Sequence, residues 1–293
     1  FVTDRTRRFA DRLAVVGAGQ RWTYAELGER SAVLATGLAR LGIAAGDRVV
    51  VQLPNIPELF EVVFALFRLG ALPVYALPAH RAHEITHLCT TAQAKALIIP
   101  DRHAGFDYRT MAAQLRHAGT APEHVVVVGE PGGFTPLAEL RADRPDPGVF
   151  TRPEASDAAF LQLSGGTTGL PKLIPRTHDD YLYSVRASAE ICALGTDTVY
   201  LAALPAVHNF PMSSPGFLGT FHAGGTVVLA PNPSPDTAFS LIETERVTIT
   251  AVVPPIALQW LDAVEHGSQS HRDLSSLRVL QVGGAKFAPE AAR

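Results

Sequence analysis

The feature that most constrains the fold is a regular alternation of short apolar segments with segments of helical periodicity. The apolar segments are rich in β-branched residues, and this pattern predicts strands that are buried on both faces. Strands are expected at 48–53, 71–77, 94–99, 124–128, 158–163, 198–204, 226–229, 247–253 and 277–282. Helices are expected at 24–41, 57–69, 84–93, 178–194, 236–245 and 255–266. This alternation predicts an α/β fold of mostly parallel sheets flanked by helices.

Composition and charge exclude several classes of protein. The chain has 293 residues, of which 47% are apolar and 18% charged, so it can bury a large core. Its formal net charge of -3 offers no basic excess for a phosphate backbone, and nucleic acid is not an expected partner. The most apolar stretch, residues 59–69, contains Glu61 and Arg68 and is too short to cross a membrane.

The cysteines and the central linker predict the compartment and the domain organisation. Cys89 and Cys192 lie far apart, which indicates free thiols in a reducing compartment and hence a cytoplasmic protein. Residues 130–157 are rich in proline and glycine and show weak periodicity, so they predict a linker. We therefore expect two α/β lobes, residues 1–155 and 156–293. The chain opens with Phe1 and stops just after a predicted strand, which predicts a fragment of a longer protein.

A loop rich in glycine and threonine follows directly on the predicted strand 158–163. Residues 163–172 have the sequence LSGGTTGLPK, in which glycines let backbone N–H groups converge on an anion. Hydroxyl groups add donors and the lysine adds a positive charge. The loop is not a Walker A motif, because no Gly-Lys-Ser/Thr closes it. The residues predicted to bind phosphate are Ser164, Gly165, Gly166, Thr167, Thr168, Gly169 and Lys172.

Two further motifs are weaker. His83, Glu84 and His87 match H-E-x-x-H, which on a helix would place two imidazoles on one face for zinc and predict a metalloprotease. No third ligand follows at a familiar spacing, so ordinary helix residues are the favoured interpretation and no metal site of the protein is expected. The segment Gly17-Ala18-Gly19 lacks the third glycine of a dinucleotide-binding fingerprint and predicts a turn.

Together these segments resemble the acyl-adenylate-forming enzymes, whose phosphate loop has the pattern S-G-[ST]-T-G-x-P-K. Within that superfamily, LPAVHNFPMSSPG at 204–216 is similar to the branch that activates 2,3-dihydroxybenzoate or salicylate for siderophore assembly. The segments QVGGAKF at 281–287, LPN at 53–55 and LPAHR at 77–81 agree with it. The resemblance covers nearly the whole chain and gives His83 and His87 no metal role.

The resemblance implies a two-step reaction that uses ATP and Mg²⁺. An aryl carboxylate attacks the α-phosphate of ATP with loss of pyrophosphate, and the aryl group then passes to the phosphopantetheine thiol of an aryl carrier protein. His208 and Lys172 are the implied catalytic residues. Lys172 and the glycine-rich loop would hold the β- and γ-phosphates, whereas His208 would lie between the carboxylate and the phosphate.

The resemblance also implies which residues line the pocket. Asn209 stands where amino-acid-activating relatives carry Asp, and its neutral amide can hydrogen-bond a phenol ortho to the carboxylate. The substrate should therefore lack an α-amino group. Ser214 would add a hydroxyl near that phenol, and Phe210 and Gly283 would line the ring slot. Gly284 and Ala285 would let adenine approach the backbone closely.

Parts of the family pattern are missing from this sequence. The adenine-stacking Tyr/Phe-Gly-Met-x-Glu segment, the ribose-binding Asp and the C-terminal domain with its catalytic Lys are absent, so we expect the chain alone to be nearly inactive but to bind aryl acid weakly. An aryl-CoA ligase and a non-catalytic adenylate-binding module are the alternatives. Salicylate, 2,3-dihydroxybenzoate and 3-hydroxypicolinate all carry the ortho hydroxyl and stay open as substrates.

Overall fold

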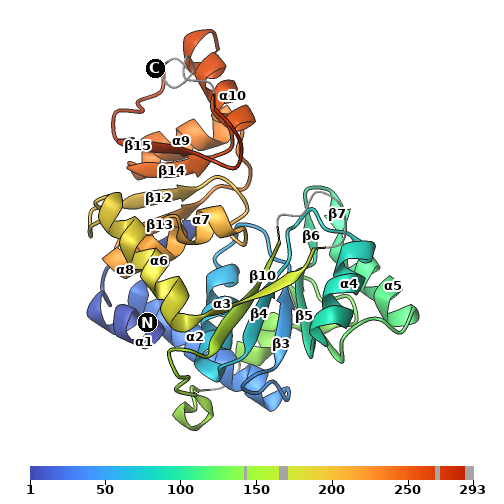
Figure 1. Cartoon of the computed structure of the whole chain (residues 1–293). Coiled ribbons are helices and arrows are strands. Elements are labelled where there is room, and N and C mark those ends of the chain that lie inside the picture. The colour runs from blue at the N-terminus through green and yellow to red at the C-terminus, as the bar shows by residue number, and fades with distance from the viewer. Residues whose placement is uncertain (142–143, 165–170, 268–270, 288–293) are drawn as a thin grey trace.

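The computed structural model describes residues 1–141, 144–164, 171–267 and 271–287, and Figure 1 shows its two open sheets with their helices. Within these residues the first sheet has seven strands in the order β11-β10-β4-β3-β5-β8-β9. Its neighbours pair in parallel, apart from the antiparallel hairpin of β10 and β11. The strands are β3 (Arg48–Val51), β4 (Leu72–Tyr75), β5 (Ala96–Pro100), β8 (His124–Val128), β9 (Thr135–Pro136), β10 (Ala158–Leu163) and β11 (Leu173–Thr177).

The second sheet has six strands among the described residues, in the order β15-β14-β12-β13-β1-β2. It is parallel except for its edge hairpin of β1 and β2. The strands are β1 (Leu13–Gly17), β2 (Gln20–Thr23), β12 (Val199–Ala202), β13 (Thr226–Leu229), β14 (Ile249–Val252) and β15 (Val279–Val282). Ala18 and Gly19 both have positive φ and form the tight turn between β1 and β2, as the glycine motif predicts.

The helices cover both faces of the two sheets. They are α1 (Val2–Arg8), α2 (Tyr24–Arg40), α3 (Glu58–Leu69), α4 (Ala82–Ala92), α5 (Tyr108–His117), α6 (His178–Ile191), α7 (Asn209–Ser213), α8 (Gly216–Ala223), α9 (Pro235–Glu245) and α10 (Pro254–Glu265). Short elements complete the chain: β6 (Arg102–His103), β7 (Phe106–Asp107), and the 3-10 turns η1 (Leu137–Arg141) and η2 (Pro147–Val149). This arrangement confirms the predicted α/β fold with parallel sheets.

Local sequence fixes where the helices begin and end. Thr23 caps α2 by accepting from the backbone N–H of Glu26, whose carboxylate accepts from the N–H of Thr23 in return. Gly70 ends α3 in the left-handed conformation with φ 68°, which a residue with a Cβ adopts at a cost. The start and the end of these two helices therefore follow from capping chemistry that is visible in the sequence.

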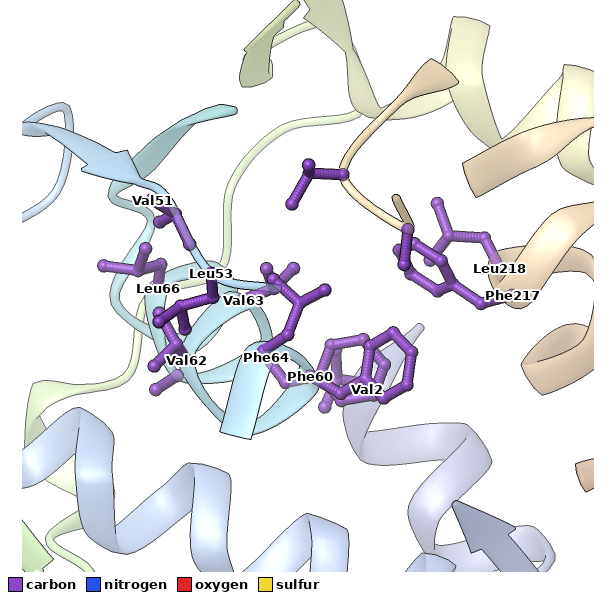
Figure 2. Close-up of a cluster of buried hydrophobic side chains, with 14 of the residues drawn as sticks. Val2, Val51, Leu53, Phe60, Val62, Val63, Phe64, Leu66, Phe217 and Leu218 are labelled. Atoms are coloured by element: carbon purple, nitrogen blue, oxygen red, sulfur yellow. The ribbon is translucent and has the colours of Figure 1, made fainter. Parts of the chain in front are cut away.

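One apolar core lies between the two sheets and two others lie on their outer faces. Alternate residues of β3 point to opposite sides, so that Val50 packs with α4 and α5 whereas Val49 and Val51 face the central core. Figure 2 shows the part of that core where side chains of α3 meet those of α8. The rings of Phe60 and Phe217 lie 4.8 Å apart by their centroids there. The outer face of the second sheet packs on α9 and α10.

Sheet membership crosses the predicted boundary near residue 155. The early hairpin β1–β2 belongs to the second sheet, and the later hairpin β10–β11 belongs to the first. The reason is that a buried strand needs a hydrogen-bonding neighbour and two apolar faces, which a distant segment can supply as well as a near one. The division into lobes at residue 155 stays a prediction, but the sheets themselves do not divide there.

The described residues also bear on the predictions about membranes and cysteines. In the described ranges, helices that could span a bilayer are not found. Cys89 and Cys192 are free thiols, as expected from their spacing, and burial raises the pKa of Cys89 to about 12. Cys89 is therefore an unreactive core residue at neutral pH.

Candidate functional site

The site lies where the two sheets approach each other, around the short helix α7 at the end of β12 (Figure 1). After β12 the chain runs through residues 203–208, and His208 then caps α7. Ligand sites of open α/β sheets lie at the carboxyl ends of the strands, and this loop occupies that position in the second sheet. The structure therefore places the predicted residues His208, Asn209, Phe210 and Ser214 on one short segment.

Asn55 of the first half of the chain holds this segment in place. Its side-chain nitrogen lies 2.9 Å from the carbonyl oxygen of Ala202 and 3.0 Å from those of Leu204 and Ala230. Its side-chain oxygen accepts from the N–H of Ala206 at 2.9 Å. One amide thus joins the ends of β12 and β13 to the loop after β3, and the sequence alone marked it only as part of the Leu-Pro-Asn resemblance.

His208 is held as a neutral donor. Its Nδ1 atom accepts from the backbone N–H of Phe210 at 3.3 Å, which leaves the proton on Nε2. Burial lowers the pKa of His208 below its ordinary value, so the ring is uncharged at neutral pH. An uncharged imidazole with its proton on Nε2 can donate a hydrogen bond to a carboxylate or phosphate oxygen.

The side chain of Asn209 is tied to the strand that leads into the phosphate loop. Its Oδ1 atom accepts from Nε2 of Gln162 at 2.7 Å and from the hydroxyl of Tyr181 at 2.8 Å. Gln162 lies on β10, two residues before Ser164, and Tyr181 lies on α6. Within the described part of the chain, Nδ2 of Asn209 has no hydrogen-bond partner, and the residue is exposed. Its two N–H donors are therefore not taken up by the described residues.

Phe210 meets the segment that follows β15. A Cβ added at Gly283 would lie 2.9 Å from the tip of the Phe210 ring, so only glycine lets the ring rest against this backbone. Gly284 has φ 86°, which also favours glycine. Ala285 and Lys286 are exposed. The structure thus brings together Phe210 and Gly283, which are distant in the sequence and were both predicted to line the ring slot.

Ser214 ends α7 and is half-buried. Its N–H donates to the carbonyl of Phe210 at 3.3 Å, and a cis peptide bond joins it to Pro215. The neighbouring Ser213 is buried and lies 3.5 Å from the side-chain oxygen of Asn209. Ser214 is thus less buried than Ser213, and its role toward a ligand stays a prediction.

The predicted phosphate loop is the connection of the β10–β11 hairpin. Ser164 and Lys172 face each other at its base, where the N–H of Ser164 donates to the carbonyl of Lys172 at 2.9 Å. The N–H of Lys172 donates to Oγ of Ser164, also at 2.9 Å, and the lysine side chain is exposed. Gly165, Gly166, Thr167, Thr168 and Gly169 lie outside the described residues, so their phosphate-binding role stays a prediction.

The H-E-x-x-H segment lies on α4, but its members have other partners. The carboxylate of Glu84 accepts from the N–H of Arg81 and caps the helix. Nε2 of His87 lies 3.0 Å from the carbonyl of Pro171, next to Lys172. Across the described ranges, groups of three or more His, Cys, Asp or Glu residues that could hold a metal ion are not found. The arrangement is that of a capped helix packed against the base of the β10–β11 hairpin.

Gly283 provides a prediction about the ring slot. Replacing it by valine should push the Phe210 ring outward, since the added Cβ would overlap the ring tip. We expect the affinity for aryl acid to fall about tenfold, in line with an overpacking cost of roughly 1–3 kcal/mol. Calorimetric titration of the variant with salicylate, beside its thermal unfolding midpoint, checks this. An unchanged affinity in a folded variant would remove Phe210 and Gly283 from the slot.

Comparison with known proteins agrees with this geometry. The model of the AMP-binding enzyme family matches residues 2–293. The chain is 58% identical over 290 residues to a 2,3-dihydroxybenzoate-AMP ligase of Bacillus subtilis, which covers 99% of this chain and 53% of that protein. It is also 46% identical over 297 residues to a salicyl-AMP ligase / salicyl-S-ArCP synthetase of Mycobacterium tuberculosis. This match covers 100% of this chain and 52% of that protein.

A solved structure agrees as well. The apo structure of Mycobacterium smegmatis MbtA superposes with a TM-score of 0.89 at 44% identity and covers 99% of this chain and 52% of the other. The chain thus spans about half the length of the curated relatives it matches.

Proposed function

The chain belongs to the AMP-binding enzyme family, and we propose that it forms the aryl-acid and phosphate half of an enzyme that activates an ortho-hydroxy aromatic carboxylic acid as its acyl adenylate. The observation that carries this proposal is the side chain of Asn209. It is a neutral amide with its N–H donors outward, linked through Gln162 to the strand that leads into the phosphate loop. A neutral donor at this place suits a phenol oxygen and offers no counter-charge to an ammonium group.

The proposed chemistry is an adenylyl transfer. A carboxylate oxygen of the aryl acid attacks the α-phosphorus of ATP, a new oxygen–phosphorus bond forms, and the bond to pyrophosphate breaks. Such a reaction depends on positioning and charge stabilisation more than on covalent help from the protein. Lys172 and the hydroxyl of Ser164 stand at the base of the phosphate loop to hold the triphosphate. His208 donates a hydrogen bond from Nε2 to an oxygen of the aryl carboxylate or of the α-phosphate as the two groups approach.

The charge state of His208 suits this role. A cationic imidazolium would pair with the aryl carboxylate and make that oxygen a weaker nucleophile. The neutral ring, held with its proton on Nε2, can hydrogen-bond an oxygen without neutralising it. The burial that lowers the pKa of His208 therefore contributes to the proposed reaction.

Mg²⁺ is expected to arrive bound to ATP. The described residues include no cluster of carboxylates or imidazoles able to hold an ion by themselves, whereas Lys172 and Ser164 are suited to phosphate oxygens. When bound, the ion supplies charge neutralisation on the triphosphate. Lys172 and Ser164 would therefore contact the phosphate oxygens and not the ion itself.

The acceptor of the activated acid is proposed to be the phosphopantetheine thiol of an aryl carrier protein. The Mycobacterium tuberculosis relative is named as a salicyl-S-ArCP synthetase as well as a salicyl-AMP ligase, which supports a carrier-protein acceptor. A salicylyl-CoA synthase / salicylate adenylyltransferase and a naphthoate–CoA ligase are also similar, at 44% and 40% identity, so coenzyme A is the competing acceptor. Thioester formation by the full-length enzyme with each thiol in turn separates the two.

We also propose the cytoplasm as the location of the enzyme, because the free cysteines fit a reducing compartment.

Direct binding to this chain tests the proposal. We expect salicylate and 2,3-dihydroxybenzoate to bind measurably more tightly than benzoate, because only they place an oxygen next to Nδ2 of Asn209. In Asn209→Ala this preference should disappear while binding of benzoate changes little. If benzoate binds the unaltered chain as tightly as salicylate, the assignment of an ortho-hydroxy acid is wrong.

A further inference from the structure

Gln162 is a buried polar residue in an otherwise apolar strand. Its side chain is 7% exposed, and its Nε2 atom donates both to Oδ1 of Asn209 at 2.7 Å and to the Tyr181 hydroxyl at 3.2 Å. The Tyr181 hydroxyl in turn donates a hydrogen bond to the same Asn209 oxygen at 2.8 Å. The three side chains thus form a closed triangle in which two of the three hydrogen bonds end on Oδ1 of Asn209 and the third ends on the Tyr181 oxygen.

The direction of this triangle decides what Asn209 offers to a ligand. An amide carries its acceptor on one side and its two donors on the other. Because Gln162 and Tyr181 both donate to Oδ1, Nδ2 is left to face outward. If Gln162 presented an acceptor instead, the Asn209 amide would turn over to donate inward, and Oδ1 would face the ligand.

Tyr181 is built to act as a constant donor. Its ring is 3% exposed, packs edge-on against Phe160 with 4.6 Å between centroids, and lies under the guanidinium of Arg176 at 5.2 Å. Burial raises the pKa of Tyr181 to about 12, so its hydroxyl keeps its proton throughout the physiological range. The direction of the hydrogen bonds that Gln162 and Tyr181 donate to Asn209 therefore does not change with pH near neutrality.

We propose that Gln162, acting with Tyr181, is a specificity-determining positioning residue that selects an ortho hydroxyl over an ortho amine on the aromatic acid. The inference rests on the function proposed above. In salicylate the phenol proton bonds to the neighbouring carboxylate, so the phenol oxygen is left as an acceptor for Nδ2 of Asn209. In anthranilate one amine proton does the same, and the other would meet the Nδ2 protons of Asn209, which offer it no acceptor.

The sharpest test reverses the polarity of the triangle with Gln162→Glu. The carboxylate has nearly the shape of the amide, but it can only accept when ionised. It should draw the Nδ2 protons of Asn209 and the Tyr181 proton toward itself and turn Oδ1 of Asn209 outward. The assay is ATP–pyrophosphate exchange by the full-length enzyme at about pH 7 and about pH 9, because burial raises the pKa of a carboxyl and the reversal should grow as the introduced carboxyl ionises.

We expect the ratio of kcat/KM for salicylate to that for anthranilate to fall at least about tenfold in Gln162→Glu, the effect of one reversed buried hydrogen bond. Tyr181→Phe removes one inward donor and should lower the same ratio by less. If thermal unfolding shows that Gln162→Glu does not fold, the ratio measured in Tyr181→Phe tests the proposal instead. Gln114→Glu on α5 and Tyr183→Phe on α6 are exposed controls of matched chemistry that should leave the ratio unchanged.

The outcomes separate this inference from the proposed function. If the unaltered enzyme shows no exchange with any ortho-hydroxy acid, the proposed function fails first. If it activates salicylate, and the folded Gln162→Glu and Tyr181→Phe variants lose activity equally toward both acids, the proposed function stands and the role of Gln162 and Tyr181 is overturned. A ratio that falls in both variants, but not in the controls, supports it.

Discussion

Replacing His208 by alanine should lower kcat for adenylate formation by about 10²–10³-fold, the usual cost of removing one preorganised donor to a developing charge. The imidazole keeps its proton on Nε2 because Nδ1 accepts from the backbone N–H of Phe210. Alanine removes that donor and the cap of α7 together. His208→Asn retains a side-chain acceptor for the cap, and a side-chain oxygen caps a helix well.

Single-turnover formation of aryl-AMP by the full-length enzyme measures this effect apart from binding. We expect the alanine variant to bind aryl acid with little change while the chemical step slows. The asparagine variant should retain the wild-type unfolding midpoint but remain slow. If His208→Ala forms the adenylate at the wild-type rate, the histidine serves only as a helix cap.

The second large effect concerns the stability of the fold at a buried ion pair. The carboxylate of Glu61 on α3 is 0% exposed and accepts two hydrogen bonds from Arg141, at 2.7 Å from Nε and 2.5 Å from Nη2. Arg141→Met leaves this carboxylate buried without its partner. We expect the free energy of unfolding at neutral pH to fall by about 3–5 kcal/mol.

The pH dependence of that loss has a definite sign. Burial raises the pKa of Glu61 above its ordinary value even beside Arg141, and removal of the arginine should raise it further. The folded state then binds a proton more tightly than the unfolded state. Stability from this group is therefore fully present below the unfolded pKa and is lost as pH rises through the folded pKa.

Denaturant unfolding of Arg141→Met at about pH 5 and about pH 7 checks both points. The variant should be closer to the wild type at the lower pH. The double variant Glu61→Gln/Arg141→Met should recover much of the loss, since no charge is then buried. Arg152→Met, at an exposed arginine, serves as the control. An equal loss at both pH values would show that packing, not the buried charge, causes the effect.

Apolar periodicity predicts the central strands well because those strands are buried on both faces. β8, β10 and β13 begin and end at the predicted residues. β1 and β11 were missed for different reasons. β1 is apolar but lies next to the Gly17-Ala18-Gly19 turn, and β11 carries Pro175 and Arg176 on an exposed edge of its sheet. Which sheet a hairpin joins depends on distant partners that periodicity does not encode.

The candidate site divides in the same way. Motif resemblance singled out His208, Asn209, Phe210 and Gly283 as predicted site residues, and the structure brings Phe210 and Gly283 into contact. The motif resemblance did not reveal the side chains that orient Asn209 or hold its segment in place. Gln162 could have been noticed as a polar residue inside an apolar strand, because a buried amide must find partners. The role of Asn55, in contrast, depends on strand ends that meet only in the folded chain.

ATP–pyrophosphate exchange by the full-length enzyme tests the central claim most directly. The acids to compare are benzoate, salicylate, 2,3-dihydroxybenzoate, 3-hydroxypicolinate and a set of amino acids. The site predicts exchange with the ortho-hydroxy acids alone, because Asn209 offers a neutral donor to the ortho oxygen and His208 donates without a charge. Exchange with amino acids only, or with no acid at all, would contradict the proposed substrate and the proposed activity.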